Sequence, residues 1–384
     1  MRRVCIVVTA RPSYSRIKTV LAAVRDHPDL ELQLVVGASA LLDRYGSAID
    51  VIRADGFEPK ATVYAVLEGE NPTSMAKTTG LAMLELATVF DNLRPDVVIS
   101  VADRFETLAT AVAASYMNIP LAHVQGGEVS GSIDEKVRHA VTKLADLHFV
   151  ATDVAGERVS RMGEDPERIY VTGCPSIDLA LEVRKEPDVD FDPFERYGGV
   201  GTNVDLSSGY LVLLQHPVTT EYESSRLQIT ETLEALRSID MPILVFWPNV
   251  DAGADGTSNG IRAFREAHQL ENFHFFKNME PHDFLRLLIG ARCLVGNSSA
   301  GIRECAFLGV PVVNIGSRQA GRERGPNVID VTSHDRRQIA DAVRIQMSAD
   351  HFPTDPVYGT GDSGTRIADL LSTVPLTIEK HLAY

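Results

Sequence analysis

Short, continuous apolar runs alternate with amphipathic helical stretches along almost the whole chain, and this alternation limits the possible folds more than any other feature. The first run is "RVCIVVTA". In the stretch "YSRIKTVLAAVRDH" that follows it, apolar residues recur at helical spacing, namely Ile17, Val20, Leu21 and Val24. A strand that is apolar at nearly every position is buried on both faces, which is typical of a parallel sheet with helical connections. The sequence therefore predicts an α/β fold.

The alternation is interrupted once, near the middle of the chain. At 384 residues the chain is too long for one ordinary core, and "EPDVDFDPFERYGGVGTNVDLSSG" shows little periodicity. We expect a Rossmann-like N-terminal domain over 1–186, a connector over 187–208 and a Rossmann-like C-terminal domain over 209–362. Residues 363–384 should form a C-terminal helix that packs back on the N-terminal domain. The two domains should face each other across a cleft where the carboxyl ends of both sheets meet.

Charge and composition argue against several classes of protein. The formal net charge of −15 argues against a nucleic-acid partner, because neutralising phosphates requires clustered Lys and Arg. The four cysteines form no CxxC pair or metal-finger spacing, so buried free thiols in a reducing compartment are expected. No apolar window approaches the roughly 18 residues of a membrane span, and the N-terminal run is too short for a signal peptide. We therefore expect a cytoplasmic protein with no membrane partner.

Two common nucleotide motifs are missing from the sequence. No GxGxxG opens a helix after the first apolar run, and no GxxxxGK[ST] is present. Their absence weighs against a tightly held dinucleotide cofactor and against a P-loop ATPase.

Polar residues cluster where the predicted strands end, which in an open α/β sheet are the crevice positions. These residues are Arg11, Ser15, Asp103, Arg104, His216, Asn249, Asp251, Asn297, Ser298, Ser299, Ser317, Arg318 and Arg322. A lone histidine at a strand end is more often structural than catalytic. Pro217, however, ends the strand before His216 and leaves the imidazole at the edge of the sheet.

The stretch "VGNSSAGIRECAFLG" has the character of a phosphate cradle. A strand ends at Gly296 and a helix begins near Ser298, so the exposed N–H groups and the helix dipole favour an anion. The alternative is that Asn297 and Ser298 merely cap this helix. The arginines of "GSRQAGRERG" either clamp a diphosphate or remain solvated surface charges.

The stretch "HVQGGEVSGSIDEKVRHAVTKL" combines two glycines with several ionisable side chains. Ser132 and Glu135 form a capping box, and Asp134 and Arg138 stand one turn apart as a helix-surface ion pair would.

A second interpretation gives the same stretch a catalytic role. Gly126 and Gly127 would let the backbone turn closely past a ligand, toward which Glu128 and Asp134 project. Both interpretations fit the residues.

The ordered motifs together resemble the hydrolysing UDP-N-acetylglucosamine 2-epimerases, from Val4 to about Tyr358. The motifs are "ARPSYS", "DRFETLA", "GGEVSGSIDEKVRHAVTKLA", "GCPSID", "QHPVTTE", "PNVDAG", "GNSSAGIREC" and "GSRQAGRERGPNV". The resemblance implies a glycosyltransferase-B-like fold with its active site between the domains. It also implies conversion of UDP-N-acetylglucosamine and water to N-acetylmannosamine and UDP, without metal or nicotinamide cofactor. Relatives of this kind form dimers or tetramers and supply precursors of sialic acid, a related nonulosonic acid or a capsule sugar.

In that family a base removes the proton at C2 while UDP leaves C1, and water then adds to the resulting 2-acetamidoglucal. The resemblance assigns Asp103 and Asp134 as catalytic carboxylates and His216 as the histidine near the leaving group. Its UDP-binding positions are Arg11, Ser15, Arg104, Ser298, Ser299, Glu304 and Arg318, with Asn249 and Lys277 as further cleft positions.

Two positions depart from the family pattern. Gln125 stands where a catalytic glutamate is expected and can only orient a group, so Glu128 or Asp134 would serve as the base. Ala40 replaces a histidine near the sugar. These departures would suit a hydrolysing epimerase for a diacetamido-trideoxy or GDP-linked sugar, and Gln125 also motivates a non-catalytic sugar-nucleotide-binding protein. A non-hydrolysing epimerase and, from the fold alone, a retaining glycosyltransferase are further alternatives.

Overall fold

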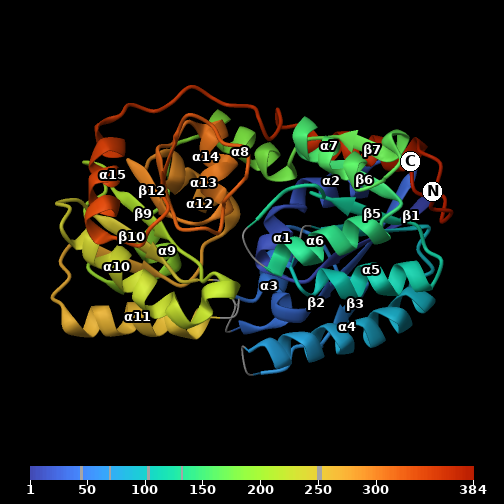
Figure 1. Cartoon of the computed structure of the whole chain (residues 1–384), viewed down its shortest axis with the longest axis horizontal. Helices are drawn as coiled ribbons and strands as arrows, with labels where there is room; N and C mark the ends of the chain where they lie inside the picture. Colours follow the sequence, from blue (N-terminus) through green and yellow to red (C-terminus); the bar gives the residue numbers. More distant parts are fainter. Residues whose placement is uncertain (44–45, 69–70, 102–103, 131–132, 249–252) are drawn as a thin grey trace. The chain divides into compact units, whose positions relative to one another are not determined.

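The computed structural model describes residues 1–43, 46–68, 71–101, 104–130, 133–248 and 253–384. It divides the chain into two compact α/β units. Unit 1 comprises Met1–Glu128, Ile133–Leu179 and Tyr358–Tyr384, and unit 2 comprises Val129–Ser132 and Ala180–Val357. In Figure 1 the last part of the red segment, which ends at the label C, accordingly lies among the blue and green elements of unit 1.

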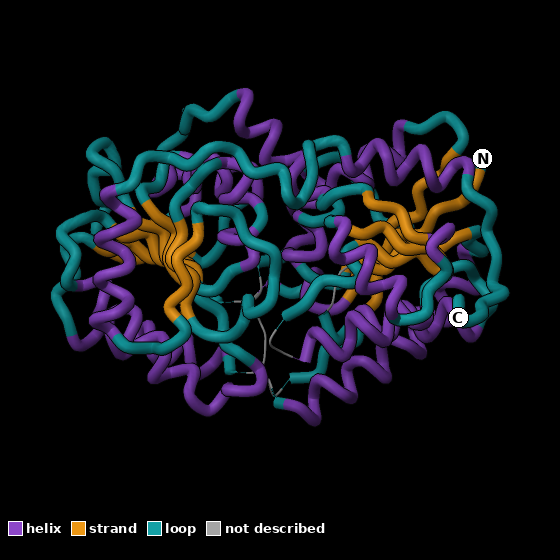
Figure 2. Tube along the Cα trace, turned by 45° about the horizontal axis from the view of Figure 1, so that its top comes forward, coloured by secondary structure: helices purple, strands orange, loops and turns teal. Residues whose placement is uncertain are grey.

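Unit 1 is built on a seven-stranded parallel sheet. Its strands are β1 (Arg2–Val8), β2 (Leu30–Gly37), β3 (Ala61–Val63), β4 (Val97–Val101), β5 (Leu121–Val124), β6 (Leu147–Val150) and β7 (Ile169–Val171). The order is β3-β2-β1-β4-β5-β6-β7, so the direction of strand addition reverses between β1 and β4. Figure 2 shows the strands of each unit as an orange sheet enclosed by purple helices.

The helices of unit 1 are α1 (Arg11–Ser15), α2 (Lys18–Asp26), α3 (Ala48–Ala54), α4 (Pro72–Leu93), α5 (Thr107–Tyr116), α6 (Ile133–Leu144), α7 (Asp153–Arg161) and α16 (Ser363–Thr373), with α8 (Pro175–Lys185) shared between the units. The apolar spacing predicted one helical stretch around Ile17, but the chain breaks there. Ile17 has ψ −5°, and α2 starts only at Lys18.

Successive side chains of β1 point to opposite faces of the sheet and pack in two different hydrophobic cores. Val4, Ile6 and Val8 pack in the cluster that includes Leu21 of α2 and Leu371 of α16. Cys5 and Val7 pack on the opposite face in the cluster with Leu86 and Phe90 of α4. The prediction of a strand buried on both faces is therefore confirmed.

Unit 2 repeats this plan with one antiparallel strand. Its strands are β8 (Val200–Gly201), β9 (Leu211–Leu214), β10 (Ile243–Phe246), β11 (Phe273–Phe276), β12 (Cys293–Gly296), β13 (Val312–Ile315) and β14 (Val328–Val331). The order is β14-β13-β12-β9-β10-β11-β8, with the reversal between β9 and β12 and with β8 antiparallel to β11. The helices are α9 (Pro193–Tyr197), α10 (Ser225–Arg237), α11 (Ala254–Ala267), α12 (Pro281–Ile289), α13 (Ser299–Ile302), α14 (Glu304–Leu308) and α15 (Arg336–Ser348).

Residues 187–208, expected to act as a connector, contribute structure to unit 2. They contain α9 and the edge strand β8, in which Gly201 pairs with His274 of β11. His274 also contacts the backbone on both sides of β8, through Nδ1 to the Thr202 carbonyl at 3.0 Å and Nε2 to the Gly198 carbonyl at 2.9 Å. This segment is therefore fixed to the sheet of unit 2.

The C-terminal helix α16 is tied to unit 1 by one buried carboxylate. Asp178 of α8 accepts hydrogen bonds from the Ser363 and Gly364 amides at the start of α16, at 3.0 and 2.7 Å. It also accepts one from Thr19 Oγ1 of α2 at 2.9 Å. One side chain thus satisfies two of the N-terminal donors of α16 and joins three helices.

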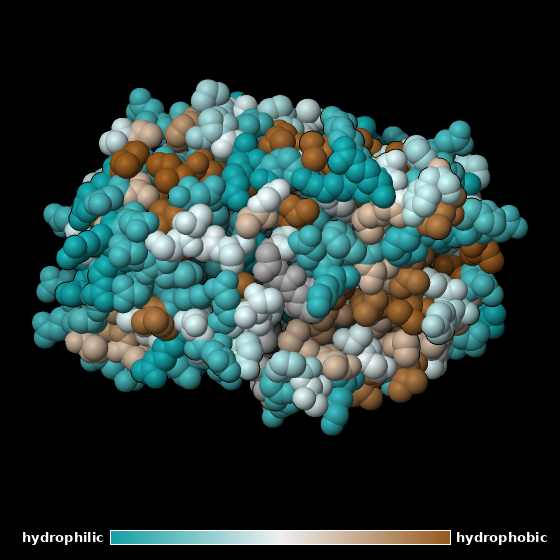
Figure 3. Space-filling view, in the orientation of Figure 1, coloured by the Kyte–Doolittle hydropathy of each residue, from teal (hydrophilic) through white to brown (hydrophobic). Residues whose placement is uncertain are grey.

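All four cysteines are buried and free, as predicted. None of the helices in the described part of the chain is both long and apolar enough to cross a membrane. The surface visible in Figure 3 is mainly hydrophilic, with hydrophobic colour over the region of α4 and α5, where Leu81 and Leu84 are exposed.

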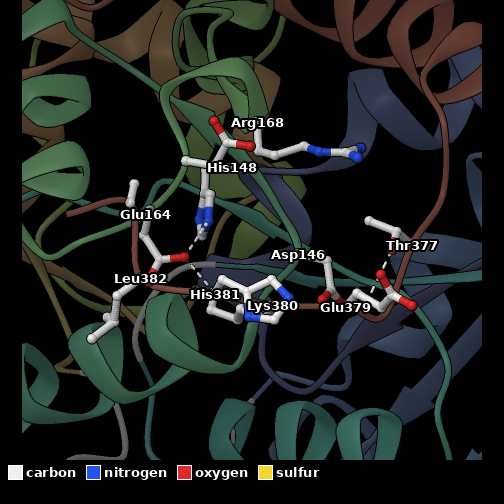
Figure 4. A pocket seen from close by; sticks show the side chains of 11 residues that line it. Asp146, His148, Glu164, Arg168, Thr377, Glu379, Lys380, His381 and Leu382 are labelled. Carbon is white, nitrogen blue, oxygen red and sulfur yellow. Dashed lines mark hydrogen bonds and ion pairs between the residues drawn. The ribbon is translucent and has the colours of Figure 1, made fainter.

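A buried charge cluster joins the C-terminal tail to unit 1. The carboxylate of Glu164, 3% exposed, accepts from Lys143 at 2.6 Å and from His148 at 3.0 Å, and it pairs with Lys380. Figure 4 shows these tail and sheet side chains around one cavity. Burial alone would raise the pKa of Glu164, but the three hydrogen bonds outweigh it and lower that pKa to about 2. The cluster therefore makes a contribution to the free energy of unfolding that depends on pH.

We expect Glu164→Gln to be less stable than the wild type by about 3 kcal/mol at neutral pH. The pKa of this carboxylate is lower in the folded state than in the unfolded state. Its full contribution to stability is therefore present when the pH is above the unfolded pKa, and it is lost as the pH falls to the folded pKa. The difference between variant and wild type should therefore shrink between pH 5 and pH 2, with the folded pKa at about 2. Denaturant unfolding across this range measures it, with the exposed Glu167→Gln as a control. A difference that does not change with pH would contradict the assignment.

Candidate functional site

Both sheets reverse their strand order at one place, and the predicted site residues follow the strands on either side of it. In unit 1 Arg11 follows β1 and Arg104 follows β4. In unit 2 His216 follows β9 and Ser298 follows β12. Ligands of open α/β sheets bind beyond the carboxyl ends of the strands at such a reversal. Each unit thus has its own candidate ligand position.

Arg11 begins α1 directly after β1, and Pro12 at the next position favours the start of a helix there. Its guanidinium makes no hydrogen bond or ion pair with any residue that the structure describes. Burial lowers the pKa of Arg11 to about 10, which is the effect expected of a desolvated cation. An arriving anion would supply the missing counter-charge. Ser15, at the other end of α1, donates to the Pro12 carbonyl at 3.1 Å.

Arg104 is buried, and it is already paired. Its Nε and Nη2 donate to the two carboxylate oxygens of Glu106, each at 3.2 Å, and its guanidinium carbon lies 5.6 Å from the centre of the Phe105 ring. Glu106 itself is 1% exposed. Glu106 therefore offsets part of the charge of Arg104, and UDP binding by Arg104 stays a prediction. Sequence inspection missed Glu106, although it stands only two positions away.

Gln125 directly follows β5 in a left-handed conformation with φ 69° and is 1% exposed. Its Nε2 donates to the thiol sulfur of Cys174 at 2.8 Å, and that sulfur lies 3.0 Å from Ser176 Oγ. The Oε1 atom is buried without a hydrogen-bond partner among the described residues. The side-chain amide of Gln125 is thus held by the "GCPS" segment, and its Oε1 atom remains available as a hydrogen-bond acceptor.

The two glycines after Gln125 are explained by packing within unit 1. A Cβ on Gly127, whose φ is +74°, would lie 2.1 Å from the carbonyl oxygen of Ala155. A Cβ on Gly126 would lie 3.0 Å from both His123 Nδ1 and Thr142 Oγ1. The close approach that requires glycine is therefore made by protein atoms, which corrects the interpretation that a ligand requires it.

Two carboxylates, Glu128 and Asp134, lie between the end of β5 and the first turn of α6. Arg138 is fully buried and donates from Nη1 to the Glu128 carbonyl at 2.8 Å, so it is not the surface side chain that the sequence suggested. Glu128 is 2% exposed, whereas Asp134 in the first turn of α6 is half-buried. Glu135 pairs with His139 one turn along, at 3.3 Å. Asp134 is therefore the more accessible carboxylate of the two.

Asn297 links the two strands at the reversal in unit 2. Its Oδ1 accepts from the His216 amide at 2.7 Å, and its Nδ2 donates to the His216 carbonyl at 2.8 Å. These two bonds fix the backbone of His216, which is 5% exposed, at the end of β9. The role of Asn297 is to join β9 to β12 rather than to cap a helix.

The predicted helix after β12 is shorter than expected. Ser298 caps α13 by accepting from the Ala300 amide at 3.3 Å, but α13 ends at Ile302 and α14 begins at Glu304. Two short helices give a weaker dipole than the single helix that the sequence suggested. An anion here would depend on the loop N–H groups and nearby side chains. Ser299 is half-buried, and Glu304 Oε2 is buried without a hydrogen-bond partner among the described residues.

The arginines of "GSRQAGRERG" are mostly engaged in the fold. Arg322 donates to the Val129 carbonyl at 2.8 Å, and Arg324 pairs with Asp330 and donates to the Gln319 carbonyl. Only Arg318 among these three is directed to the end of β12, where it donates to the Asn297 carbonyl at 3.3 Å. The expected clamp is thus reduced to Arg318, because the other two stabilise the loop.

The remaining predicted positions have mixed outcomes. Lys277 directly follows β11 and is exposed. Ala40 is fully buried in the core beside β1, so it does not line an open sugar pocket. Asp103 and Asn249 lie outside the described residues, as do Asp251 and Ser132 of the proposed capping box.

Comparison with known proteins identifies the group to which this architecture belongs. A family model described as UDP-N-acetylglucosamine 2-epimerase matches residues 22–372. The chain belongs to the UDP-N-acetylglucosamine 2-epimerase family.

Two curated members of this epimerase family match nearly the whole chain. The "UDP-N,N'-diacetylbacillosamine 2-epimerase (hydrolyzing)" of Legionella pneumophila is 33% identical over 377 residues, covering 98% of this chain and 97% of that protein. The UDP-N-acetylglucosamine 2-epimerase of Neisseria meningitidis is 30% identical over 382 residues, covering 97% and 95%. This epimerase is therefore an enzyme whose relatives act on different sugars.

Solved structures of the epimerase family share the fold. The Neisseria meningitidis enzyme bound to UDP-GlcNAc superposes with a TM-score of 0.77 at 17% identity, covering 96% of this chain and 99% of that one. The Methanocaldococcus jannaschii enzyme in complex with UDP-GlcNAc and UDP gives 0.78 at 19% identity, with 96% and 99% covered. The prediction of two parallel-sheet α/β domains of the glycosyltransferase-B-like type is confirmed.

Proposed function

We propose that this epimerase is hydrolysing and converts UDP-N-acetylglucosamine and water to N-acetylmannosamine and UDP. The observation that supports hydrolysis is the relative at 33% identity over 98% of the chain, whose name includes it. The N-acetylglucosamine substrate is supported by the family model and by the Neisseria meningitidis relative at 30% identity. The accessible carboxylate of Asp134 supports it, because the reaction requires proton transfer at C2 of the sugar.

The proposed chemistry divides between the two units. In unit 1 Asp134 removes the C2 proton as UDP leaves C1, and water then adds at C1 while Glu128 or Asp103 returns a proton to the other face of C2. Gln125 orients the sugar through its unpaired Oε1. In unit 2 the segments after β9, β12 and β13 stabilise the departing UDP with His216, Ser298, Ser299 and Arg318. Glu304, with a buried unpaired oxygen, accepts from the ribose hydroxyls. Lys277 and Asn249 are proposed as outer contacts.

Arg11 provides a direct test of sugar-nucleotide binding. Hydrogen bonds to charged groups are worth about 1.5–3 kcal/mol, so Arg11→Met should weaken binding of the UDP sugar by about 10- to 100-fold. The ligand-free variant should also unfold at a higher temperature, because it removes a desolvated cation that lacks a described partner. Titration calorimetry and thermal unfolding measure both effects, with the exposed Arg161→Met as a control. Unchanged affinity would exclude Arg11 from the site.

A second candidate substrate is a UDP-linked diacetamido-trideoxyhexose, favoured by the name of the Legionella pneumophila relative. The buried Ala40 gives no support for an altered sugar pocket, whereas Gln125 still departs from the expected glutamate. Incubation of the purified protein with both UDP sugars, followed by separation of free sugar from UDP, distinguishes them. Turnover of UDP-N-acetylglucosamine at the higher kcat/KM supports the first candidate. Release of free sugar only from the diacetamido substrate would transfer the assignment to the second.

A further inference from the structure

We propose that Lys380 in the C-terminal tail is a positioning residue for helix α6, whose first turn carries Asp134. Its ammonium group holds the carboxyl end of α6 and ties it to Glu164. This inference rests on the proposed function, since Asp134 matters for turnover only if the protein is an epimerase that uses this carboxylate.

Lys380 contacts carbonyls at the end of α6. Its Nζ donates to the Ala145 carbonyl and, at 3.5 Å, to the Thr142 carbonyl. The Ala145 amide bonds to the Val141 carbonyl at 2.9 Å, so the helical turn runs to Ala145. The last carbonyls of a helix have no partner within the helix, and a cation beside them is favoured by the helix dipole. Lys380 therefore acts as a C-terminal cap supplied from 235 residues away.

The same ammonium group pairs with Glu164, and Glu164 also holds α6 from a second side. Lys143 in the last turn of α6 donates to Glu164 at 2.6 Å and to the Met162 carbonyl at 3.0 Å. His148 of β6 adds the third donor at 3.0 Å. Glu164 thus connects the tail, the sheet and the end of α6 in one buried cluster.

The tail around Lys380 is fixed by other contacts, so the ammonium group is presented from an ordered segment. Arg168 donates to the Pro375 carbonyl at 2.7 Å, and the Ala383 amide donates to the Gly163 carbonyl at 3.1 Å. A cavity of about 340 Å³ adjoins Lys380. Its other charged or titratable lining residues are Asp146, His148, Glu164, Asp165, Arg168, Glu379 and His381 (Figure 4). Solvent and small solutes can therefore reach the space next to the ammonium group.

The far end of α6 makes the connection to the proposed site. Helix α6 comprises 12 residues, from Ile133 to Leu144. At about 1.5 Å per residue it is about 18 Å long. Arg138 in its middle donates to the Glu128 carbonyl, so a displaced helix shifts both carboxylates. A displacement of about 1 Å at a catalytic group can cost about 100-fold in rate. Holding the carboxyl end of α6 therefore matters for Asp134.

The test is Lys380→Ala in the full-length protein. We expect kcat to fall about tenfold or more, whereas KM for the UDP sugar and the affinity for UDP stay within about twofold. Propylammonium replaces the deleted atoms and should restore most of kcat through the cavity. Propanol, of the same size but uncharged, should not. Lys60→Ala, at an exposed position of unit 1, should keep wild-type kcat.

Hydrogen exchange separates this inference from the proposed function. In Lys380→Ala the amides of residues 141–145 should exchange about tenfold faster, and propylammonium should restore their protection. This readout holds even if the wild type turns over no UDP sugar, an outcome that would refute the function alone. Unchanged exchange, or a wild-type kcat in the variant, would overturn the positioning role. So would an increase in KM with kcat unchanged.

Discussion

Asp134→Asn should bind UDP with wild-type affinity and lose turnover by about 10²- to 10⁴-fold, the range associated with one acid/base group. Asparagine keeps the size of the side chain but cannot take up a proton. Asp134 lies half-buried in the first turn of α6, so the substitution should not disturb the core. Steady-state kinetics and UDP titration on the same preparation give both quantities.

The neighbouring Glu135→Gln is the matched control for this variant. Glu135 lies in the same helical turn and pairs with His139 at 3.3 Å. The Glu135→Gln variant should therefore keep a kcat within severalfold of the wild type. Full activity in Asp134→Asn would exclude Asp134 as the base. Glu128 would then take that role, and Glu128→Gln would become the inactive variant.

Gly127→Ala should destabilise unit 1 by about 4 kcal/mol or more, which is at the upper end for a single substitution. The added Cβ would lie 2.1 Å from the Ala155 carbonyl oxygen and 2.8 Å from Val159 Cγ2. The φ of +74° adds the cost of a left-handed conformation for a residue with a side chain. Arg158 of α7 donates to the Gly127 carbonyl at 3.3 Å, a hydrogen bond that a separation of the turn from α7 would strain. Urea unfolding measures the change.

Gly56→Ala separates the two causes in that prediction. Gly56 has φ +83°, but a Cβ there would meet no atom within 4 Å. The free energy of unfolding of Gly56→Ala should be lower than that of the wild type by only about 1–2 kcal/mol, which is the cost of the left-handed conformation itself. If Gly127→Ala is no less stable than Gly56→Ala, the clash with α7 is not what requires glycine. A selective loss of UDP-sugar binding would then support approach of a ligand to this turn.

The sheet architecture could be predicted from the sequence because its signals are local. Each buried strand is a continuous apolar run, such as Val4 to Val8 in β1, and helical spacing marks the next stretch of the chain. The break at Ile17 and the break between α13 and α14 escaped prediction because apolar spacing continues across them. Strand β8 escaped because two residues become a strand only by pairing with β11.

For the candidate site, polar residues could be located from the sequence, but the hydrogen-bond and charge partners of these residues could not. Strand-end position correctly placed Arg11 and His216 beside the strand reversals. Nothing in the motif around Gln125 indicates that Cys174 holds its amide, since that contact comes from 49 residues along the chain. Glu164 and Lys380 are separated by 216 residues and meet only in the fold. Such contacts depend on tertiary packing, which no local pattern encodes.

The proposed reaction is tested most directly by incubating the protein with UDP-N-acetylglucosamine in deuterated water and analysing the products by nuclear magnetic resonance. Hydrolytic epimerisation predicts UDP and free N-acetylmannosamine in equal amounts, with one deuterium at C2 of the sugar. A C2-labelled sugar that remains attached to UDP, or hydrolysis that leaves C2 unlabelled, would contradict it.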